Sequence, residues 1–160
     1  MKKKLLILLI FIFTLPQLQA QVREIWMFGP MMHVNFGGEK TRVSWALEFS
    51  YWNYQRFPYS FDFAFEFERG KMRLYSEAQT GFGFGGIAAG PVFEFGSNVN
   101  KPRIGFQGSI WGNYFLGFDI RTRRIGGETF FSPGTYLKYP TAVFTKEFHE
   151  GNSSSDWDWD

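Results

Sequence analysis

Residues 60–68 alternate between phenylalanine and small or acidic residues with a period of two. Successive side chains of a β-strand point to opposite faces of a sheet, so this period predicts a strand. One face would carry Phe61, Phe63, Phe65 and Phe67, and the other would carry Ser60, Asp62, Ala64, Glu66 and Glu68. A strand of this kind must separate two environments of very different polarity.

Further stretches with the same alternation are bounded by turn-like segments. They cover residues 26–36, 42–52, 72–79, 84–95, 103–124 and 129–139. The stretch 103–124 is too long for one strand, and Gly112 with Asn113 predicts a tight turn that divides it. After Pro140, residues 142–148 either extend the last strand or are irregular. This gives about eight strands of roughly ten residues, the length that crosses a bilayer, whereas strands of soluble proteins centre on five or six.

The polar phase of these strands contains many small residues: Ala46, Ala64, Gly86, Ala88, Gly90, Gly105, Gly117 and Gly134. Glycine weakens a strand and brings no advantage on a face open to water. Inside a narrow eight-stranded barrel, small residues leave room for long ones. The small residues therefore favour a barrel with the polar phase inside.

The same phase carries charges of both signs, which we predict to form a network in the lumen. The predicted members are Arg42, Glu48, Asp62, Glu66, Arg73, Glu77, Glu94, Arg103, Asp119, Arg121 and Lys138. Cations that faced lipid would each cost up to about 2–4 kcal/mol near the midplane, whereas charges of opposite sign can pair inside the barrel. The four phenylalanines Phe61, Phe63, Phe65 and Phe67 are then predicted to face lipid.

Aromatic residues near the predicted strand ends fit the interfacial girdles of membrane barrels. They are Trp26, Tyr51, Trp52, Tyr59, Trp111, Tyr114 and Tyr139. The combined prediction is an all-β fold: a single antiparallel up-and-down transmembrane β-barrel of about eight strands.

The two ends of the chain differ from this barrel in composition. Residues 1–20 have three lysines, an apolar run, Pro16 and Ala20, which predicts a cleaved signal peptide; an apolar run of about 11 residues is too short to span a bilayer. Residues 21–145 form the predicted barrel, and residues 146–160 form a predicted disordered acidic tail with Trp157 and Trp159. Without residues 1–20 the chain has 14 basic and 15 acidic residues, so no nucleic-acid partner is predicted.

The export signal, strand count, alternation and charged lumen resemble the small eight-stranded outer-membrane β-barrels of the OmpX or OmpA-transmembrane-domain type. This resemblance covers residues 26–139 and implies an outer-membrane location, contact with outer-membrane lipids, and both termini in the periplasm. Such barrels commonly end on an aromatic residue of the last strand, whereas this chain continues into the tail.

No residue pattern predicts catalysis, a cofactor or a metal site, because the chain has two distant histidines and no cysteine. The leading hypothesis is a non-enzymatic structural protein or a subunit of an envelope complex, with the tail tryptophans as a possible contact to a larger membrane subunit. A second hypothesis is a lipid acyl hydrolase using His33, with Ser44, Ser50 or Glu48 completing the site. A third is a soluble lipocalin-like barrel that binds an apolar ligand in a phenylalanine-lined cavity.

Overall fold

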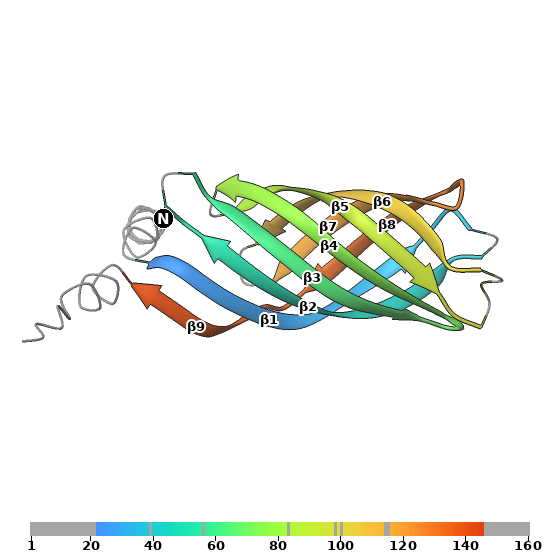
Figure 1. The fold of residues 1–160 in the computed structure, drawn as a ribbon, viewed down its shortest axis with the longest axis horizontal. Coiled ribbons are helices and arrows are strands. Elements are labelled where there is room, and N and C mark those ends of the chain that lie inside the picture. The colour runs from blue at the N-terminus through green and yellow to red at the C-terminus, as the bar shows by residue number, and fades with distance from the viewer. Residues whose placement is uncertain are drawn as a thin grey trace, which may run out of the picture.

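The computed structural model describes residues 22–145, except residues 39, 56, 83, 98, 100, 114 and 115. Within this part of the chain, antiparallel strands close into an eight-stranded barrel (Figure 1). The strands are β1 (Val22–Asn35), β2 (Arg42–Asn53), β3 (Tyr59–Glu68), β4 (Lys71–Phe82), β5 (Gly85–Phe95), β6 (Arg103–Asn113), β7 (Gly117–Ile125), β8 (Glu128–Tyr136) and β9 (Tyr139–Thr145). From β1 to β8 each strand pairs with the next one in sequence, and β1 pairs with β2 on one side and with β8 and β9 on the other. The strands β8 and β9 therefore share the eighth position.

The two ends of the barrel differ in what they carry. β1 begins and β9 ends at one end, which we call the terminal end (Figure 1). The opposite end carries the connections 36–41, 69–70, 96–102 and 126–127, and we call it the loop end. Two of these connections have only two residues. Gly126 and Gly127 both have positive φ angles (58° and 90°), as a type I′ hairpin turn requires.

The strand predicted at residues 129–139 is in fact two strands. β8 ends at Tyr136 and β9 begins at Tyr139, with Leu137 and Lys138 between them. β1 pairs with β8 over three residues and with β9 over six, with shifts in register, but with β2 over twelve. Prolines lie on both sides of this seam, Pro30 in β1 and Pro140 in β9, and proline has no N–H for the ladder. Residues 142–145 extend the last strand, whereas residues 146–148 lie outside the described part.

The turn predicted at Gly112 and Asn113 is also misplaced. Both residues belong to β6, which continues to Asn113, and Asn113 pairs with Gly117 at the start of β7. The connection is therefore 114–116. Glycine and asparagine indicated a turn, but pairing of both residues with neighbouring strands keeps them in the sheet.

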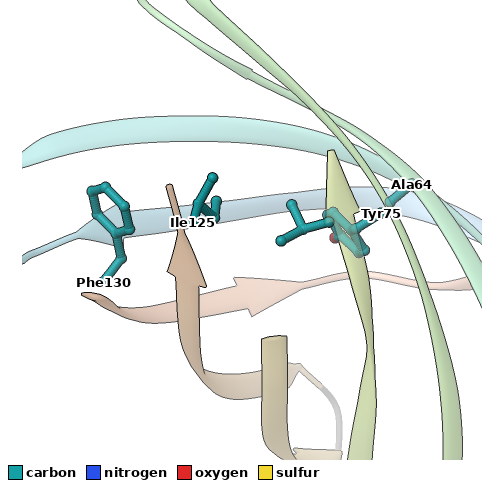
Figure 2. Packing of buried hydrophobic residues seen from close by; sticks show 5 residues of the cluster. Ala64, Tyr75, Ile125 and Phe130 are labelled. Carbon is teal, nitrogen blue, oxygen red and sulfur yellow. The ribbon is translucent and has the colours of Figure 1, made fainter. Parts of the chain in front are cut away.

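Side chains alternate between the lumen and the outer face, as the period of two predicts. In β7, buried and exposed residues alternate from Gly117 to Ile125 without a break. Charged and polar residues occupy much of the buried phase, and an apolar cluster of Ala64, Tyr75, Val92, Ile125 and Phe130 lies among them (Figure 2). The core of this protein is thus the barrel lumen, and most of it is polar.

Two of the aromatic residues predicted for interfacial girdles belong to the lumen. Trp52 is buried in the inward phase of β2, and Trp111 packs against a buried cluster of Met31, Ala46 and Tyr136. The rings of Trp52 and Trp111 meet edge to face at 5.5 Å. A strand-end position suggested a girdle, but the phase of the strand decides which side of the wall a ring occupies.

Candidate functional site

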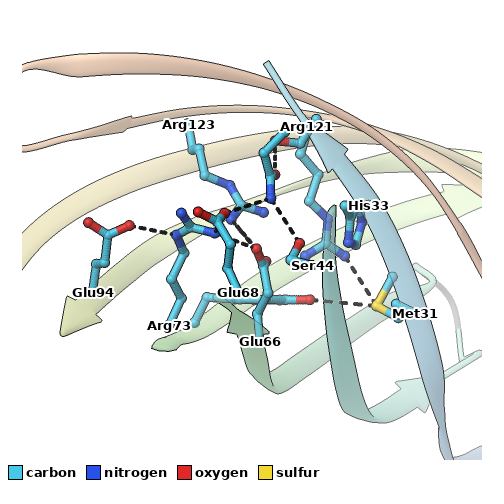
Figure 3. Close-up of polar contacts among 12 residues, drawn as sticks. Met31, His33, Ser44, Glu66, Glu68, Arg73, Glu94, Arg121 and Arg123 are labelled. Atoms are coloured by element: carbon cyan, nitrogen blue, oxygen red, sulfur yellow. Dashed lines mark hydrogen bonds and ion pairs between the residues drawn. The ribbon is translucent and has the colours of Figure 1, made fainter. Parts of the chain in front are cut away.

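The lumen near the loop end contains a network of ion pairs centred on two buried arginines (Figure 3). Glu66 bridges them, with its oxygens 2.7 Å from Arg73 Nη1 and 2.9 Å from Arg123 Nη1. Arg73 also donates to Glu94 at 2.8 Å and to Glu68 at 3.0 Å. All five side chains are almost completely buried. Each arginine is held by carboxylates from other strands, so the network crosslinks the wall of the barrel.

This network continues to the mouth of the barrel. Arg103 pairs with Glu94 and, at 3.0 Å, with Glu128. Lys71 Nζ lies 3.9 Å from Glu94, and Arg42 Nε lies 3.8 Å from Glu68. We call this connected set the loop-end network; its members are Arg42, Lys71, Arg73, Arg103, Arg123, Glu66, Glu68, Glu94 and Glu128.

A second network lies nearer the terminal end and is centred on Arg121. Its guanidinium lies 2.5 Å from Asp119, 3.1 Å from Glu48 and 3.8 Å from Glu77. Lys138, in the gap between β8 and β9, pairs with Glu48 at 2.6 Å and Asp62 at 2.9 Å. We call the set Glu48, Asp62, Glu77, Asp119, Arg121, Lys138 and His33 the terminal-end network. Lys138 keeps the inward phase of Phe130, Ser132 and Tyr136 in β8, so its charge lies inside the lumen in spite of the break between the two strands.

Two cavities lie in the barrel, one beside each network. The first, which we call the chamber, has a volume of about 150 Å³ and is lined near the terminal end by rings such as Trp52, Trp111 and Tyr136 and by Glu77 and Arg121. The second, which we call the vestibule, has a volume of about 650 Å³ at the loop end. It is lined by Asn35, Gly38, Lys40, Arg42, Glu68, Lys71, Val99, Lys101, Arg103, Glu128 and Phe130. The cavities have no lining residue in common.

The two halves of the lumen carry opposite net charge among the described residues. The loop-end network together with Lys40 and Lys101 of the vestibule has seven cations and four carboxylates, an excess of three positive charges. The terminal-end network has two cations and four carboxylates, an excess of two negative charges when His33 is counted as neutral. Glu39, beside Lys40 in sequence, lies outside the described residues; counting it would leave an excess of two positive charges.

The structure brings all eleven predicted lumen charges into these two networks. Eight of them are buried: Glu48, Asp62, Glu66, Arg73, Glu77, Glu94, Asp119 and Arg121. Arg42, Arg103 and Lys138 are partly exposed, with side-chain exposures of 34%, 26% and 10%. Each of the eleven lies within 4 Å of a charge of opposite sign.

The sequence analysis missed several members of the site. Arg123 is buried and paired with Glu66, and it follows Asp119 and Arg121 in the same phase of β7, so the alternation could have identified it. Glu68 belongs to the phase of Asp62 and Glu66. Tyr75 also has the inward phase, and its hydroxyl donates to Glu48 at 3.1 Å. The inward phase of the strands is therefore the sequence signal that identifies all three residues.

His33, proposed above as a catalytic residue of a lipid hydrolase, points into the lumen. It is completely buried, and its Nε2 lies 3.0 Å from Asp119. Ser44 accepts a hydrogen bond from Asn35, and Ser50 accepts one from Lys138. His33 Nδ1 has no hydrogen-bond partner among the described residues. The described geometry therefore pairs His33 with a carboxylate and with none of the three partners suggested for it.

The outer face of the strands is apolar around the barrel. Phe61, Phe63 and Phe67 are exposed and Phe65 is half-buried, so these four predicted lipid-facing residues point away from the lumen. The third hypothesis required these phenylalanines to line a ligand cavity, and this arrangement contradicts such a cavity. Among the described outward-facing strand residues, only Glu24 and Arg124 are charged, and they lie near opposite ends of the barrel.

Comparisons with known proteins identify no family for this chain. No protein family model matches the chain, and no curated protein sequence matches it. The described residues contain no group of three or more His, Cys, Asp or Glu side chains that could hold a metal ion. No helix in the described part is long and apolar enough to cross a membrane.

Proposed function

We propose that this chain is a small integral outer-membrane β-barrel of the OmpX or OmpA-transmembrane-domain type, with a filled lumen and no enzymatic activity. The observation that carries the proposal is the outer face, which is apolar and charge-free between Glu24 and Arg124 among the described residues. An apolar surface of this extent is unfavourable in water. In a membrane barrel the outer face contacts lipid, where charged side chains are destabilising. The export signal predicted at residues 1–20 supports the same location.

The dimensions of the barrel agree with this proposal. β3 has ten residues, and β-strands rise about 3.3 Å per residue, so a tilt near 40° gives a height of about 25 Å. This is the height of the apolar band in outer-membrane barrels. The aromatic pairs Trp26 with Tyr51, and Tyr59 with Phe61, lie toward the terminal end of this outer face.

We propose that the lumen is closed in the middle, which favours a structural or subunit role. The vestibule and the chamber share no lining residue, and the apolar cluster with Tyr75, Ile125 and Phe130 occupies the lumen (Figure 2). The side chains Arg73, Arg123 and Glu66 are fixed there by ion pairs. The acidic tail with Trp157 and Trp159, outside the described residues, is a candidate contact to a larger membrane subunit.

The decisive experiment is gel migration of the protein with and without boiling in detergent, on envelope fractions that separate inner from outer membrane. The proposal expects outer-membrane enrichment and a folded band that migrates differently before boiling. Phe63→Arg should lower the folded fraction by the equivalent of about 2–4 kcal/mol, whereas Phe63→Leu should leave it nearly unchanged. A soluble, heat-insensitive wild-type protein would refute the proposal.

Two further measurements separate the proposed role from its alternatives. Purified barrel in planar bilayers should give no stable ion conductance, and a reproducible wild-type conductance would refute the closed lumen. His33→Ala should leave the envelope lipid profile unchanged while the folded band persists. A changed acylation pattern in that variant would favour the hydrolase hypothesis instead.

A further inference from the structure

The vestibule is a cavity with a cationic wall and few free acceptors. Its lining contains five cations, Lys40, Arg42, Lys71, Lys101 and Arg103, and two carboxylates, Glu68 and Glu128. Lys40 and Lys101 are exposed, so the cavity reaches the surface at the loop end. Its volume of about 650 Å³ falls within the range of roughly 300–1,000 Å³ typical of small-molecule sites.

Both vestibule carboxylates are already engaged by neighbouring donors. Glu68 accepts hydrogen bonds at 3.0 Å from Asn35 and Arg73, and Glu128 accepts one at 3.0 Å from Arg103. The positive charge of Lys40 and Lys101 thus adds to a lining whose acids are already paired. An anion entering the vestibule would meet a surplus of cations.

The layer beneath the vestibule also contains cationic donors. Arg73 Nη2 and Arg123 Nε and Nη2 are buried N–H groups with no hydrogen-bond partner among the described residues. In the described part of the chain, Gln107, which pairs with Arg123 in the sheet, leaves one donor and one acceptor unpartnered as well, and Arg121 Nη1 is a further unpartnered donor in the terminal-end half. Buried donors are normally satisfied, so the three arginine groups in this layer remain able to donate to an acceptor. Among the described residues, unpaired cationic donors are thus present both in the lining of the vestibule and in the layer beneath it.

We infer that the vestibule binds a phosphate-class anion between Lys40, Lys71 and Lys101. These lysines come from three separate places in the chain: the β1–β2 connection, the start of β4 and the β5–β6 connection. They can therefore approach one ligand from different sides. A phosphate group offers several charged acceptor oxygens, and lysine ammonium groups bind it as point charges.

This inference goes beyond the proposed function and does not depend on it. The vestibule is formed by inward side chains and loops, so it exists whether the outer face meets lipid or detergent. Failure of anion binding would leave the heat-dependent gel shift and membrane fractionation unaffected. Conversely, a barrel that failed those tests could still bind the anion.

The test is calorimetric titration of the full chain, folded in neutral detergent micelles, with inorganic pyrophosphate. The wild type should bind saturably, with affinity that falls as salt is added because screening weakens exposed charge interactions. The double variant Lys71→Gln with Lys101→Gln should bind at least about tenfold more weakly, since two charge-assisted contacts are lost. Arg23→Gln, which removes a cation from β1 near the terminal end, should bind like the wild type.

Folding of each variant is checked by the gel shift before titration. Absence of saturable binding by folded wild type would overturn the inference, and so would equal affinities of the wild type and the double variant. If the double variant does not fold, Lys101→Gln alone, in an exposed loop, replaces it and should still weaken binding several-fold.

The source of the phosphate is distinguished by repeating the titration in nanodiscs. Phosphatidylcholine nanodiscs with phosphatidic acid are compared with nanodiscs of phosphatidylcholine alone. Weaker apparent pyrophosphate affinity in the first would identify a lipid phosphate headgroup as the competing ligand. Equal saturable binding in both would identify a free anion.

Discussion

The two halves of the lumen use the same strands and the same inward phase, yet they carry opposite net charge. The difference arises from position along the strands. Three of the strands that start at the loop end begin with an inward-phase cation, Arg42 in β2, Lys71 in β4 and Arg103 in β6. By contrast β3, β5 and β7, which start at the terminal end, begin with Tyr59, Gly85 and Gly117. The phase determines which residues enter the lumen, and the three cations at strand starts contribute to the positive excess of the loop-end half.

This comparison gives a rule for substitutions. In the loop-end half, which has excess cations, loss of a carboxylate should be the damaging change. In the terminal-end half, which has excess acids, loss of a cation should be the damaging change. Breaking a buried ion pair from one side leaves an uncompensated charge, and such changes commonly cost about 3–5 kcal/mol.

The largest effect is expected for Glu66→Gln in the loop-end half. Glu66 is the carboxylate shared by Arg73 and Arg123, and its neutralisation removes the charge that compensates both. We expect a loss of about 3–5 kcal/mol in the free energy of unfolding, measured by urea titration with the gel shift as readout. A loss below about 1 kcal/mol would contradict the assignment of Glu66 as the centre of this network.

The next largest effect is expected for Arg121→Met in the terminal-end half. Arg121 is within 4 Å of Asp119, Glu48 and Glu77, and Lys138 is the one other cation that the terminal-end network offers them. We expect a loss of about 3 kcal/mol by the same measurement. The matched control is Arg123→Met, two residues further along β7. It should lower the free energy of unfolding by less, because Glu66 remains paired with Arg73 in that variant. A larger loss for Arg123→Met than for Arg121→Met would contradict the proposed difference in net charge between the two halves.

A smaller effect is expected for Glu77→Gln, the same chemical change as Glu66→Gln but in the acidic half. Glu77 accepts a hydrogen bond from Ser109 at 3.3 Å and lies 3.8 Å from Arg121, so its contacts are long. Neutralising it also reduces the local excess of negative charge. We expect a change of about 1 kcal/mol or less in the unfolding free energy. A loss of unfolding free energy equal to that of Glu66→Gln would show that the net charge of each half does not determine the effect of losing a carboxylate.

The smallest effect is expected for Glu128→Gln at the mouth of the vestibule. Glu128 pairs with Arg103, but its side chain is 50% exposed. Exposed ion pairs contribute about 0–1 kcal/mol and are screened by salt. Unfolding titrations at low and high salt should therefore differ little between this variant and the wild type, and any difference should shrink at high salt. A difference that grows with salt would contradict this picture.

The alternation in sequence was sufficient to predict the all-β fold, the barrel of eight strand positions and the polar phase inside it. It could do so because strand phase is a local property, readable from residues such as Phe61 and Asp62. The break at Leu137 and Lys138 could not be predicted this way. It depends on how β8 and β9 meet Gly29 and Pro30 of β1, more than a hundred residues away in sequence.

The ion-pair partners within the two networks could not be predicted from the sequence either. Arg123 of β7 reaches Glu66 of β3 across the lumen, and Arg121 reaches Glu48 of β2. Such partners are set by the tilt and stagger of strands that are not neighbours. The set of inward charges was predictable from phase, whereas the division into two networks of opposite sign required the closed barrel.

The seam between β1 and the interrupted last strand has a consequence for biogenesis. It joins the first strand to the last, so this ladder can form only after every other strand of the wall has been made. Its pairing is also the least regular, since Gly29 and Pro30 have no register partner between the β9 and β8 segments. The final step of assembly therefore gains less backbone pairing than the β1–β2 hairpin does. The ion pairs of Lys138 with Glu48 of β2 and Asp62 of β3 then reach past β1 and join the segment between β8 and β9 to the other side of the seam from within the lumen.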